Sequence, residues 1–94
     1  MIFEWCENKR TCNFEKHTLD FACAHELWLS DMYVTEDTRF AYGEQRFIAL
    51  GLLKSRIVVC IYTKRENEVI RIISLRKANH REIKSYEQYI KTKT

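Results

Sequence analysis

The most constraining feature of this chain is an unbroken apolar run, Ile-Val-Val-Cys-Ile, inside residues 56–63. A short β-branched run of this kind is typical of a central strand that is covered on both faces. Segments with strand character flank it over residues 46–53 and 68–76, and only Lys54-Ser55 and residues 64–67 separate the three. Connections this short join neighbouring antiparallel strands, so the sequence predicts an antiparallel meander.

Two further strands and a surface helix are predicted before this meander. Alternating apolar and polar residues indicate a strand over residues 2–5, and β-branched and aromatic residues indicate another over 32–35. Residues 7–17 are mostly polar and indicate a short surface helix, and residues 38–45 form a polar connection.

Two more helices are predicted from apolar stripes. Phe21, Ala24 and Trp28 are spaced i, i+3 and i+7, which places them on one helix face. Asn79 and Glu82 form a capping-box pattern that begins a C-terminal helix. The stripe of that helix, expected to pack on the sheet, consists of Ile83, Tyr86 and Ile90.

These elements predict a single α+β domain over residues 1–94, with two N-terminal helices and one C-terminal helix packed on an antiparallel sheet. A chain of 94 residues supports one modest core, and residues 91–94 are expected to be a frayed tail. The composition, 46% apolar and 31% charged, is that of a globular chain, and no segment is apolar enough to span a membrane. No signal peptide is visible, so the expected location is the cytoplasm.

The cysteines and histidines show no metal-binding pattern. Cys6, Cys12, Cys23 and Cys60 have no C-x-x-C spacing, and together with the histidines they match no zinc motif. Cys23 and Cys60 lie among apolar residues and are expected in the core. We therefore expect no structural metal, no cofactor and no catalytic cysteine.

Charge is divided unevenly along the chain. Residues 1–44 carry four Lys/Arg and nine Asp/Glu, a net charge of −5, whereas residues 45–94 carry twelve and four, a net charge of +8. A strongly basic half favours a polyanionic partner, with nucleic acid as the leading candidate. The alternative is a solvated surface on which opposite charges mix in space.

The basic residues are concentrated around the last two predicted strands. In the last strand, alternation places Ile70, Ile72, Ser74 and Arg76 on one face and Val69, Arg71, Ile73 and Leu75 on the other. Adjacent antiparallel strands bring their ends and turns together, which would gather the cations of residues 62–65 with those of 71–78. A guanidinium on a rigid strand can form two hydrogen bonds with phosphate and stabilise the charge that develops during RNA cleavage. A solvated strand end is the alternative for each arginine.

RNA cleavage without a metal also needs groups that accept and donate a proton. His17 is a candidate because imidazole exchanges protons near neutral pH, although a lone histidine is more often structural. Glu44 is a second candidate, and an ordinary ion pair with Arg46 explains its position nearly as well. Tyr62 could stack on a base, whereas strand aromatics are usually part of the core.

The same residues belong to an ordered set that runs over nearly the whole chain. It begins with Phe3-Glu4-Trp5, Glu7-Asn8-Lys9, Asn13 and Lys16-His17, and continues with Phe21 and with Gly43-Glu44 and Arg46. It ends with Val59, Tyr62, Thr63, Arg65, Arg71-Ile72-Ile73-Ser74, Arg76-Lys77-Ala78, Glu82 and Tyr86-Glu87. Taken together, this set resembles the BrnT family of bacterial toxins, which are ribonucleases of type II toxin–antitoxin systems.

Three positions depart from the family pattern. Cys6 stands where the family usually has Asp, which removes a side-chain cap from the first helix. Thr18 stands where Gly is usual after Lys-His, and Gly would allow a positive φ there. Leu75 stands where Ala is common.

The resemblance implies a RelE-like fold, cleavage of RNA, growth arrest and neutralisation by a small DNA-binding antitoxin of the BrnA type. Carried over by matching motif, the catalytic residues would be Arg65, Arg76, His17 and Glu44, and the RNA-binding residues Lys16, Arg46, Tyr62 and Lys77. Arg65 and Arg76 are assigned to phosphate and transition-state contact. Operator DNA would be bound only indirectly, through the antitoxin complex.

The sequence hypothesis is therefore a metal-independent endoribonuclease toxin that makes a cyclic-phosphate product by attack of the 2′-OH. One alternative is a non-catalytic nucleic-acid-binding module with the same fold. Another is an inactive toxin homologue that is kept as a protein-interaction partner. Cleavage of RNA separates the first hypothesis from both.

Overall fold

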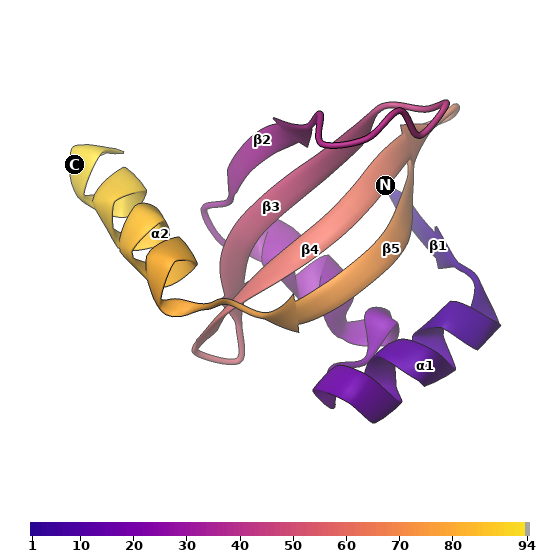
Figure 1. Cartoon of the computed structure of the whole chain (residues 1–94), viewed down its shortest axis with the longest axis horizontal. Coiled ribbons are helices and arrows are strands. Elements are labelled where there is room, and N and C mark those ends of the chain that lie inside the picture. Colours follow the sequence, from indigo (N-terminus) through magenta and orange to yellow (C-terminus); the bar gives the residue numbers. More distant parts are fainter. Residues whose placement is uncertain (94) are drawn as a thin grey trace.

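In the computed structural model, which describes residues 1–93, the chain folds into a five-stranded sheet with three helices (Figure 1). The strands are β1 (Ile2–Trp5), β2 (Tyr33–Asp37), β3 (Arg46–Leu53), β4 (Arg56–Arg65) and β5 (Val69–Lys77). The helices are α1 (Glu7–His17), the 3-10 helix η1 (Phe21–Leu29) and α2 (His80–Lys93). The strand order is β1-β5-β4-β3-β2, so β1 and β2 form the two edges.

The predicted meander of β3, β4 and β5 is confirmed. β3 pairs antiparallel with β4 as far as Leu53↔Arg56, and β4 pairs antiparallel with β5. Lys54 and Ser55 connect β3 to β4 with φ values of 51° and 68°, the left-handed geometry of a type I′ turn. This turn matches the twist of the flanking strands and so helps to fix their register.

The sheet is mixed, which corrects the antiparallel sheet predicted from the sequence. β1 pairs parallel with the first half of β5, from Ile2↔Val69 to Trp5↔Ile72. The prediction was wrong because α1, η1 and three strands separate β1 from β5 along the chain. No turn sets the direction of such a distant pair, so the packing of the whole domain decides it.

β5 contains one residue more than β4 in the paired region. Ile61 lies opposite Ser74 while Tyr62 lies opposite Ile72, so Ile73 is the extra residue of a β-bulge. A one-residue shift moves all later side chains to the opposite face of the sheet. The strict alternation predicted for this strand is therefore wrong beyond the bulge.

The bulge sorts the side chains of β5 into one apolar and one charged face. Ile70, Ile72 and Leu75 all join the same buried cluster, although Leu75 is three positions after Ile72 and five after Ile70, which strict alternation would place on opposite faces. Arg71 and Arg76, predicted on different faces, share the other side of the sheet.

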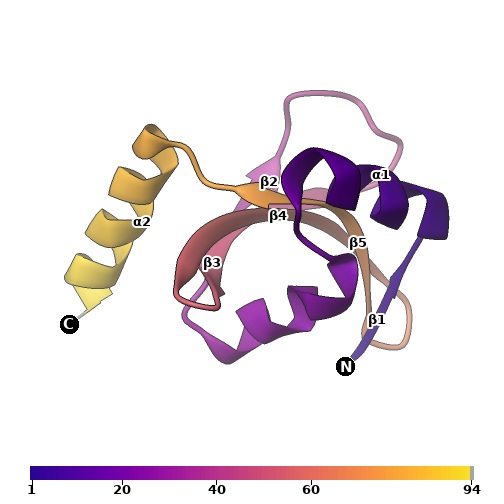
Figure 2. The ribbon, with the colours of Figure 1, turned by 90° about the horizontal axis from the view of Figure 1, so that it is seen from below.

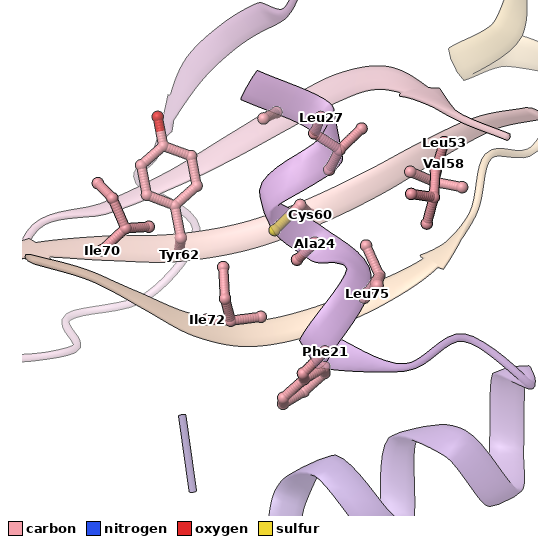
Figure 3. Close-up of a cluster of buried hydrophobic side chains, with 11 residues drawn as sticks. Phe21, Ala24, Leu27, Leu53, Val58, Cys60, Tyr62, Ile70, Ile72 and Leu75 are labelled. Atoms are coloured by element: carbon pink, nitrogen blue, oxygen red, sulfur yellow. The ribbon is translucent and has the colours of Figure 1, made fainter. Parts of the chain in front are cut away.

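The main core lies between η1 and the sheet (Figure 3). Phe21, Ala24 and Leu27 are at most 1% exposed, whereas Trp28, predicted as part of this stripe, is only partly buried. The reason is that η1 is a 3-10 helix, in which every third residue returns to the same face. Cys60 is fully buried beneath η1 as expected, and burial raises the pKa of its thiol to about 12.

α2 contacts the sheet through a small second core on the opposite face. Tyr86 is 4% exposed and packs with Leu50 and Val59, and its hydroxyl donates to the Asp31 carbonyl at 2.7 Å. Ile90 of the predicted stripe packs against this cluster as well.

The C-terminal half of α2 lies against the β2 edge, because the Tyr89 ring stacks on the Tyr33 ring at a centroid distance of 4.7 Å. In the same half of the helix, Lys93 Nζ lies 3.3 Å from Asp31 Oδ1. The helix covers only one corner of the sheet (Figure 1).

The sequence predicted features of three helix termini. Thr18 ends α1 with φ 58°, and its amide donates to the Phe14 carbonyl at 2.8 Å, so a non-glycine residue adopts the left-handed conformation. Cys6, at the N-cap of α1, provides no side-chain cap. α2 continues through Lys93, where a frayed tail was predicted, and Thr94 lies outside the described residues.

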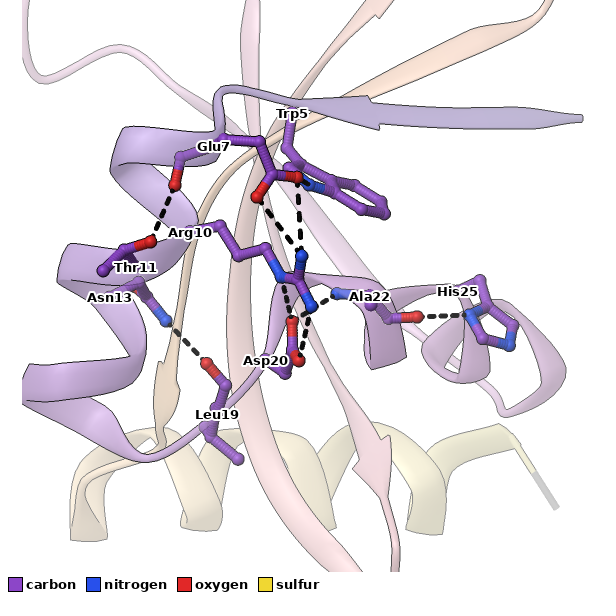
Figure 4. Close-up of polar contacts among 9 residues, drawn as sticks. All are labelled: Trp5, Glu7, Arg10, Thr11, Asn13, Leu19, Asp20, Ala22 and His25. Carbon is purple, nitrogen blue, oxygen red and sulfur yellow. Dashed lines mark hydrogen bonds and ion pairs between the residues drawn. The ribbon is translucent and has the colours of Figure 1, made fainter.

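α1 covers the part of β5 that β1 leaves unpaired. β1 pairs only as far as Ile72, so the Leu75 backbone has no strand partner on that side. The Asn13 side chain takes the place of a strand, because Nδ2 donates to the Leu75 carbonyl at 2.7 Å and Oδ1 accepts from the Leu75 amide at 3.2 Å. Nδ2 also donates to the Leu19 carbonyl at 3.2 Å (Figure 4).

We predict that Asn13→Ala lowers the free energy of unfolding by about 3 kcal/mol, because two buried backbone groups of Leu75 lose their partner. Urea unfolding followed by circular dichroism measures this loss. Asn8→Ala, on an exposed position of α1, is the matched control and should cost less than about 0.5 kcal/mol. A loss for Asn13→Ala as small as that of the control would contradict the edge role of Asn13.

Candidate nucleic-acid interface

The face of the sheet turned away from η1, here called the open face, carries a row of arginines. Arg46 on β3, Arg65 on β4, and Arg71 and Arg76 on β5 belong to it, since the alternate residues of each strand face the main core. α2 covers one corner of this face, and the connection between β2 and β3 arches over it (Figure 2). Guanidinium groups on rigid strands are suited to contacts with phosphate.

At one end of the open face, two carboxylates hold three of these arginines. Glu44 Oε2 accepts from Arg46 Nε at 3.2 Å, and Glu44 Oε1 lies 3.5 Å from Arg65 Nη2. Glu4 Oε2 accepts from Arg71 Nη1 at 2.7 Å and lies 3.9 Å from Arg65 Nε. The ion pair of Glu44 with Arg46 is therefore present. From the sequence, this pair was the alternative to a catalytic role for Glu44. We call these five residues the Glu44 cluster.

At the other end of the open face, Glu82 in the first turn of α2 holds Arg76. Arg76 Nη1 and Nη2 each donate to a Glu82 oxygen at 2.8 Å, and Nη1 also donates to the Lys77 carbonyl at 3.3 Å. The predicted capping box is confirmed, with reciprocal bonds of 2.8 and 2.9 Å between Asn79 and Glu82. Hydrogen bonding to Arg76 lowers the pKa of Glu82. The arrangement leaves the Nε–H and one Nη2–H of Arg76 available to an anion.

The last turn of α1 lies beside the C-terminal end of β5 (Figures 1 and 2). This turn carries Lys16 and His17. His17 is partly buried, and its imidazole forms no hydrogen bond or ion pair with any residue from 1 to 93. Lys77 is exposed and lies opposite Val58, so it projects from the η1 side of the sheet. We call Arg76, Lys77, Lys16 and His17 together the Arg76 end.

The two ends are too far apart to contact one phosphate group. Arg76 lies opposite Val59, and Arg65 is six residues further along β4. At the rise of a strand, this is a separation of about 20 Å. The expected gathering of Arg65 with Arg76 is therefore wrong, because the turn after Arg65 leads into the start of β5 whereas Arg76 lies near its end. The two arginines share a face and not a site.

Tyr62, predicted to contact RNA, is a core residue. Its side chain is 3% exposed, and its ring packs against Phe47 and Trp28 with centroid distances of 5.3 and 5.0 Å. Burial raises the pKa of its hydroxyl. A base cannot reach this ring, so the alternative of a core aromatic is the correct one.

A buried carboxylate that sequence reasoning missed organises the connection between β2 and β3. Asp37 is 4% exposed and accepts from Arg39 Nε and Nη2 at 2.8 and 2.9 Å and from the Tyr42 hydroxyl at 2.9 Å. Hydrogen bonds from Arg39 hold the pKa of Asp37 well below its usual range. The Tyr42 ring in turn lies 4.1 Å from the Arg46 guanidinium. Asp37 therefore supports the loop that carries Glu44.

No three His, Cys, Asp or Glu side chains within residues 1–93 come together in a way that could hold a metal ion. The four cysteines carry free thiols. No helix in the described part of the chain is both long and apolar enough to cross a membrane.

The fold and its row of arginines define a small α+β protein whose open face carries guanidinium groups of the kind that can contact phosphate. Residues 5–82 match the family described as "Ribonuclease toxin, BrnT, of type II toxin-antitoxin system". The chain therefore belongs to the BrnT family of ribonuclease toxins, as its ordered residue set indicated.

A solved structure agrees with this assignment. The fold is similar to the 1.1 Å crystal structure of the Brucella abortus ribonuclease toxin BrnT, with a TM-score of 0.65 and 30% sequence identity. The match covers 85% of this chain and 100% of that chain. No curated protein sequence matches the chain.

We predict that Asp37→Asn lowers the free energy of unfolding at pH 7 by about 2 kcal/mol, because charged hydrogen bonds to Arg39 are lost. The folded-state pKa of Asp37 is depressed, so its carboxylate stabilises the fold above the unfolded pKa of about 4. This stabilisation is lost as the pH falls through the folded-state pKa. The difference between wild type and variant should therefore shrink between about pH 5 and pH 2.

Urea unfolding over this pH range measures the difference. Glu66→Gln, in the exposed turn between β4 and β5, removes the same charge without a buried partner and is the control. A difference between Asp37→Asn and wild type that stays constant with pH would show that Asp37 acts by packing alone.

Proposed function

We propose that this chain is an endoribonuclease that cleaves RNA without a metal ion, arrests growth and is neutralised by a BrnA-type antitoxin. Membership of the BrnT family makes it a toxin of a type II toxin–antitoxin system. The observation that carries the site assignment is Arg76, which lies on the open face with one edge of its guanidinium unused.

The proposed reaction is a transesterification within the RNA strand. The 2′-oxygen attacks the adjacent phosphorus, so a P–O2′ bond forms while the P–O5′ bond breaks. The 2′-OH proton passes to a base, and an acid supplies a proton to the leaving O5′. The products are a 2′,3′-cyclic phosphate and a 5′-hydroxyl end, and all atoms come from the RNA and the transferred protons.

Arg76 is assigned to the charge that develops on the phosphate in the transition state. Its Nε–H and remaining Nη2–H lie on one edge of the guanidinium, the geometry for two hydrogen bonds with a phosphate. Glu82 holds this group in place before the substrate arrives, and preorganised donors need no rearrangement during the reaction. His17 is assigned to proton transfer, and Lys16 and Lys77 to neighbouring phosphates.

The Glu44 cluster is assigned to binding the RNA strand at a distance from the phosphate that is cleaved. Arg65 is 48% exposed, and its contacts with Glu44 and Glu4 are 3.5 and 3.9 Å long, so its guanidinium can turn toward a phosphate. Glu44, a candidate for proton transfer from the sequence, orients Arg46 and Arg65 in this proposal. The RNA would then lie across the open face, in contact with two groups about 20 Å apart.

Replacing one arginine at each end should separate catalysis from binding. We expect Arg76→Ala to lower kcat by about 10²–10³-fold, the usual effect of removing one transition-state donor. Arg65→Ala should mainly raise KM, because it removes a contact made before and during the reaction. Steady-state cleavage of a fluorescent RNA oligonucleotide measures both constants.

Arg81→Ala is the matched control, since Arg81 is exposed in the first turn of α2 and has no carboxylate partner within residues 1–93. It should change either constant by less than about threefold. A double variant, Arg65→Ala with Arg76→Ala, that cleaves RNA at the wild-type rate would overturn the site assignment.

Cleavage should continue undiminished in excess EDTA and should leave a cyclic phosphate, because protein cations and not a metal ion stabilise the phosphate in this proposal. Electrophoresis and mass spectrometry of the products test both statements. Loss of activity in EDTA that magnesium restores would point to a metal enzyme. Salt-dependent binding of RNA without cleavage in either condition would favour the non-catalytic alternative.

A further inference from the structure

A groove beside the Arg76 end has no part in the function proposed above. It lies where the last turn of α1, the start of η1 and the turn between β3 and β4 meet, and its volume is about 340 Å³. Phe14, Leu19, Cys23 and Leu53 form its apolar wall. This volume is at the small end of the range for ligand sites, on the order of 300–1,000 Å³, and suits one planar group better than a protein segment.

Phe14 is the part of this wall with the largest exposed surface. It is 51% exposed on a helix whose other residues are mostly polar. Its side chain also lines a second hollow of about 310 Å³, which Asp20 shares. An aromatic ring open to solvent beside a groove can stack on any nucleic-acid base, because every base has a π-face.

Two cations without carboxylate partners lie on the rim of the groove. Lys54 and Arg56 are exposed, and neither forms an ion pair with another of the 93 described residues, unlike the arginines of the open face. The type I′ turn that contains Lys54 fixes its backbone relative to the sheet. Unpaired cations beside an apolar wall match the alternation of phosphate and base along an RNA strand.

The carboxylate that lines the groove is already neutralised. Asp20 accepts from Arg10 Nε and Nη2 at 2.7 and 3.0 Å and from the Ala22 amide at 2.9 Å (Figure 4). Hydrogen bonding to Arg10 lowers the pKa of Asp20. The charges left on the rim are therefore positive, which favours a polyanion over a neutral or basic peptide.

We propose that this groove binds one unpaired base of the substrate RNA, stacked on Phe14, while Lys54 and Arg56 hold the flanking phosphates. The inference rests on the proposed RNA substrate and adds a base-binding site outside the Arg76 end. Thr18 lines the groove and directly follows His17 in the chain. A strand that is cleaved at the Arg76 end can therefore continue into the groove.

The stacking contact is tested with a labelled single-stranded RNA whose 2′-hydroxyls are all methylated, so that it binds without being cleaved. Fluorescence anisotropy should show about tenfold weaker binding for Phe14→Ala. Phe14→Trp should retain binding, whereas Phe14→Leu, which keeps apolar bulk without a ring, should bind like Phe14→Ala. An abasic strand of the same length should bind all four proteins equally. Circular dichroism verifies that each variant is folded.

The phosphate contacts are tested by the dependence of the same binding constant on salt. A double variant, Lys54→Gln with Arg56→Gln, should reduce the magnitude of the slope of log K against log salt by about 1.4, since each phosphate contact on a single strand contributes about 0.7. Phe14→Ala should leave the slope unchanged. Lys9→Gln with Lys84→Gln, which removes the same charge outside the groove, is the control.

The proposal is wrong if Phe14→Ala binds the base-bearing strand as wild type does, or loses affinity equally for the base-bearing and abasic strands. It is also wrong if Phe14→Ala binds RNA normally but no longer binds the antitoxin, because the groove would then be a protein-docking surface. The proposed function fails separately, when the wild-type chain shows the expected binding pattern and yet cleaves no RNA.

Discussion

β5 has one more residue than β4 between Ile72 and Ser74, and the direction of every later side chain in that strand depends on it. Without the bulge, continued alternation would place Arg76 against η1 in the main core and Leu75 on the open face. An unpaired guanidinium in that core would cost several kcal/mol, so the bulge serves the core as well as the site. Asn13 binds the Leu75 backbone just beyond the bulge, where no strand continues the sheet.

The charge division along the chain does not produce two oppositely charged faces. Glu4 and Glu44 come from the acidic half of the sequence and pair with arginines of the basic half. Partly exposed ion pairs of this kind are worth about 0–1 kcal/mol, so a phosphate can replace the carboxylate at small cost. Lys54 and Arg56 have no such partner within residues 1–93, so their charge is available without any exchange.

Sequence patterns predicted the structure correctly where neighbours in sequence are neighbours in space. The capping box of Asn79 with Glu82 and the turn at Lys54-Ser55 are local in this sense. The apolar stripe of η1 was harder to predict, because apolar residues occupy both position 27 and position 28. Which of the two faces the core depends on whether the helix has three or 3.6 residues per turn. The parallel pairing of β1 with β5 had no local signal, because more than 60 residues separate the partners.

By itself, the sequence determined the family, the antiparallel meander, the capped final helix and the set of cations that can meet a phosphate. These follow from short-range patterns and from side-chain chemistry, which do not depend on distant contacts. The tertiary structure alone decided that Arg65 and Arg76 share a face and not a site, that Tyr62 is buried, and that a carboxylate at position 37 supports the loop with Glu44. These outcomes depend on strand register, on the bulge and on burial, which arise only when segments far apart in the chain pack together.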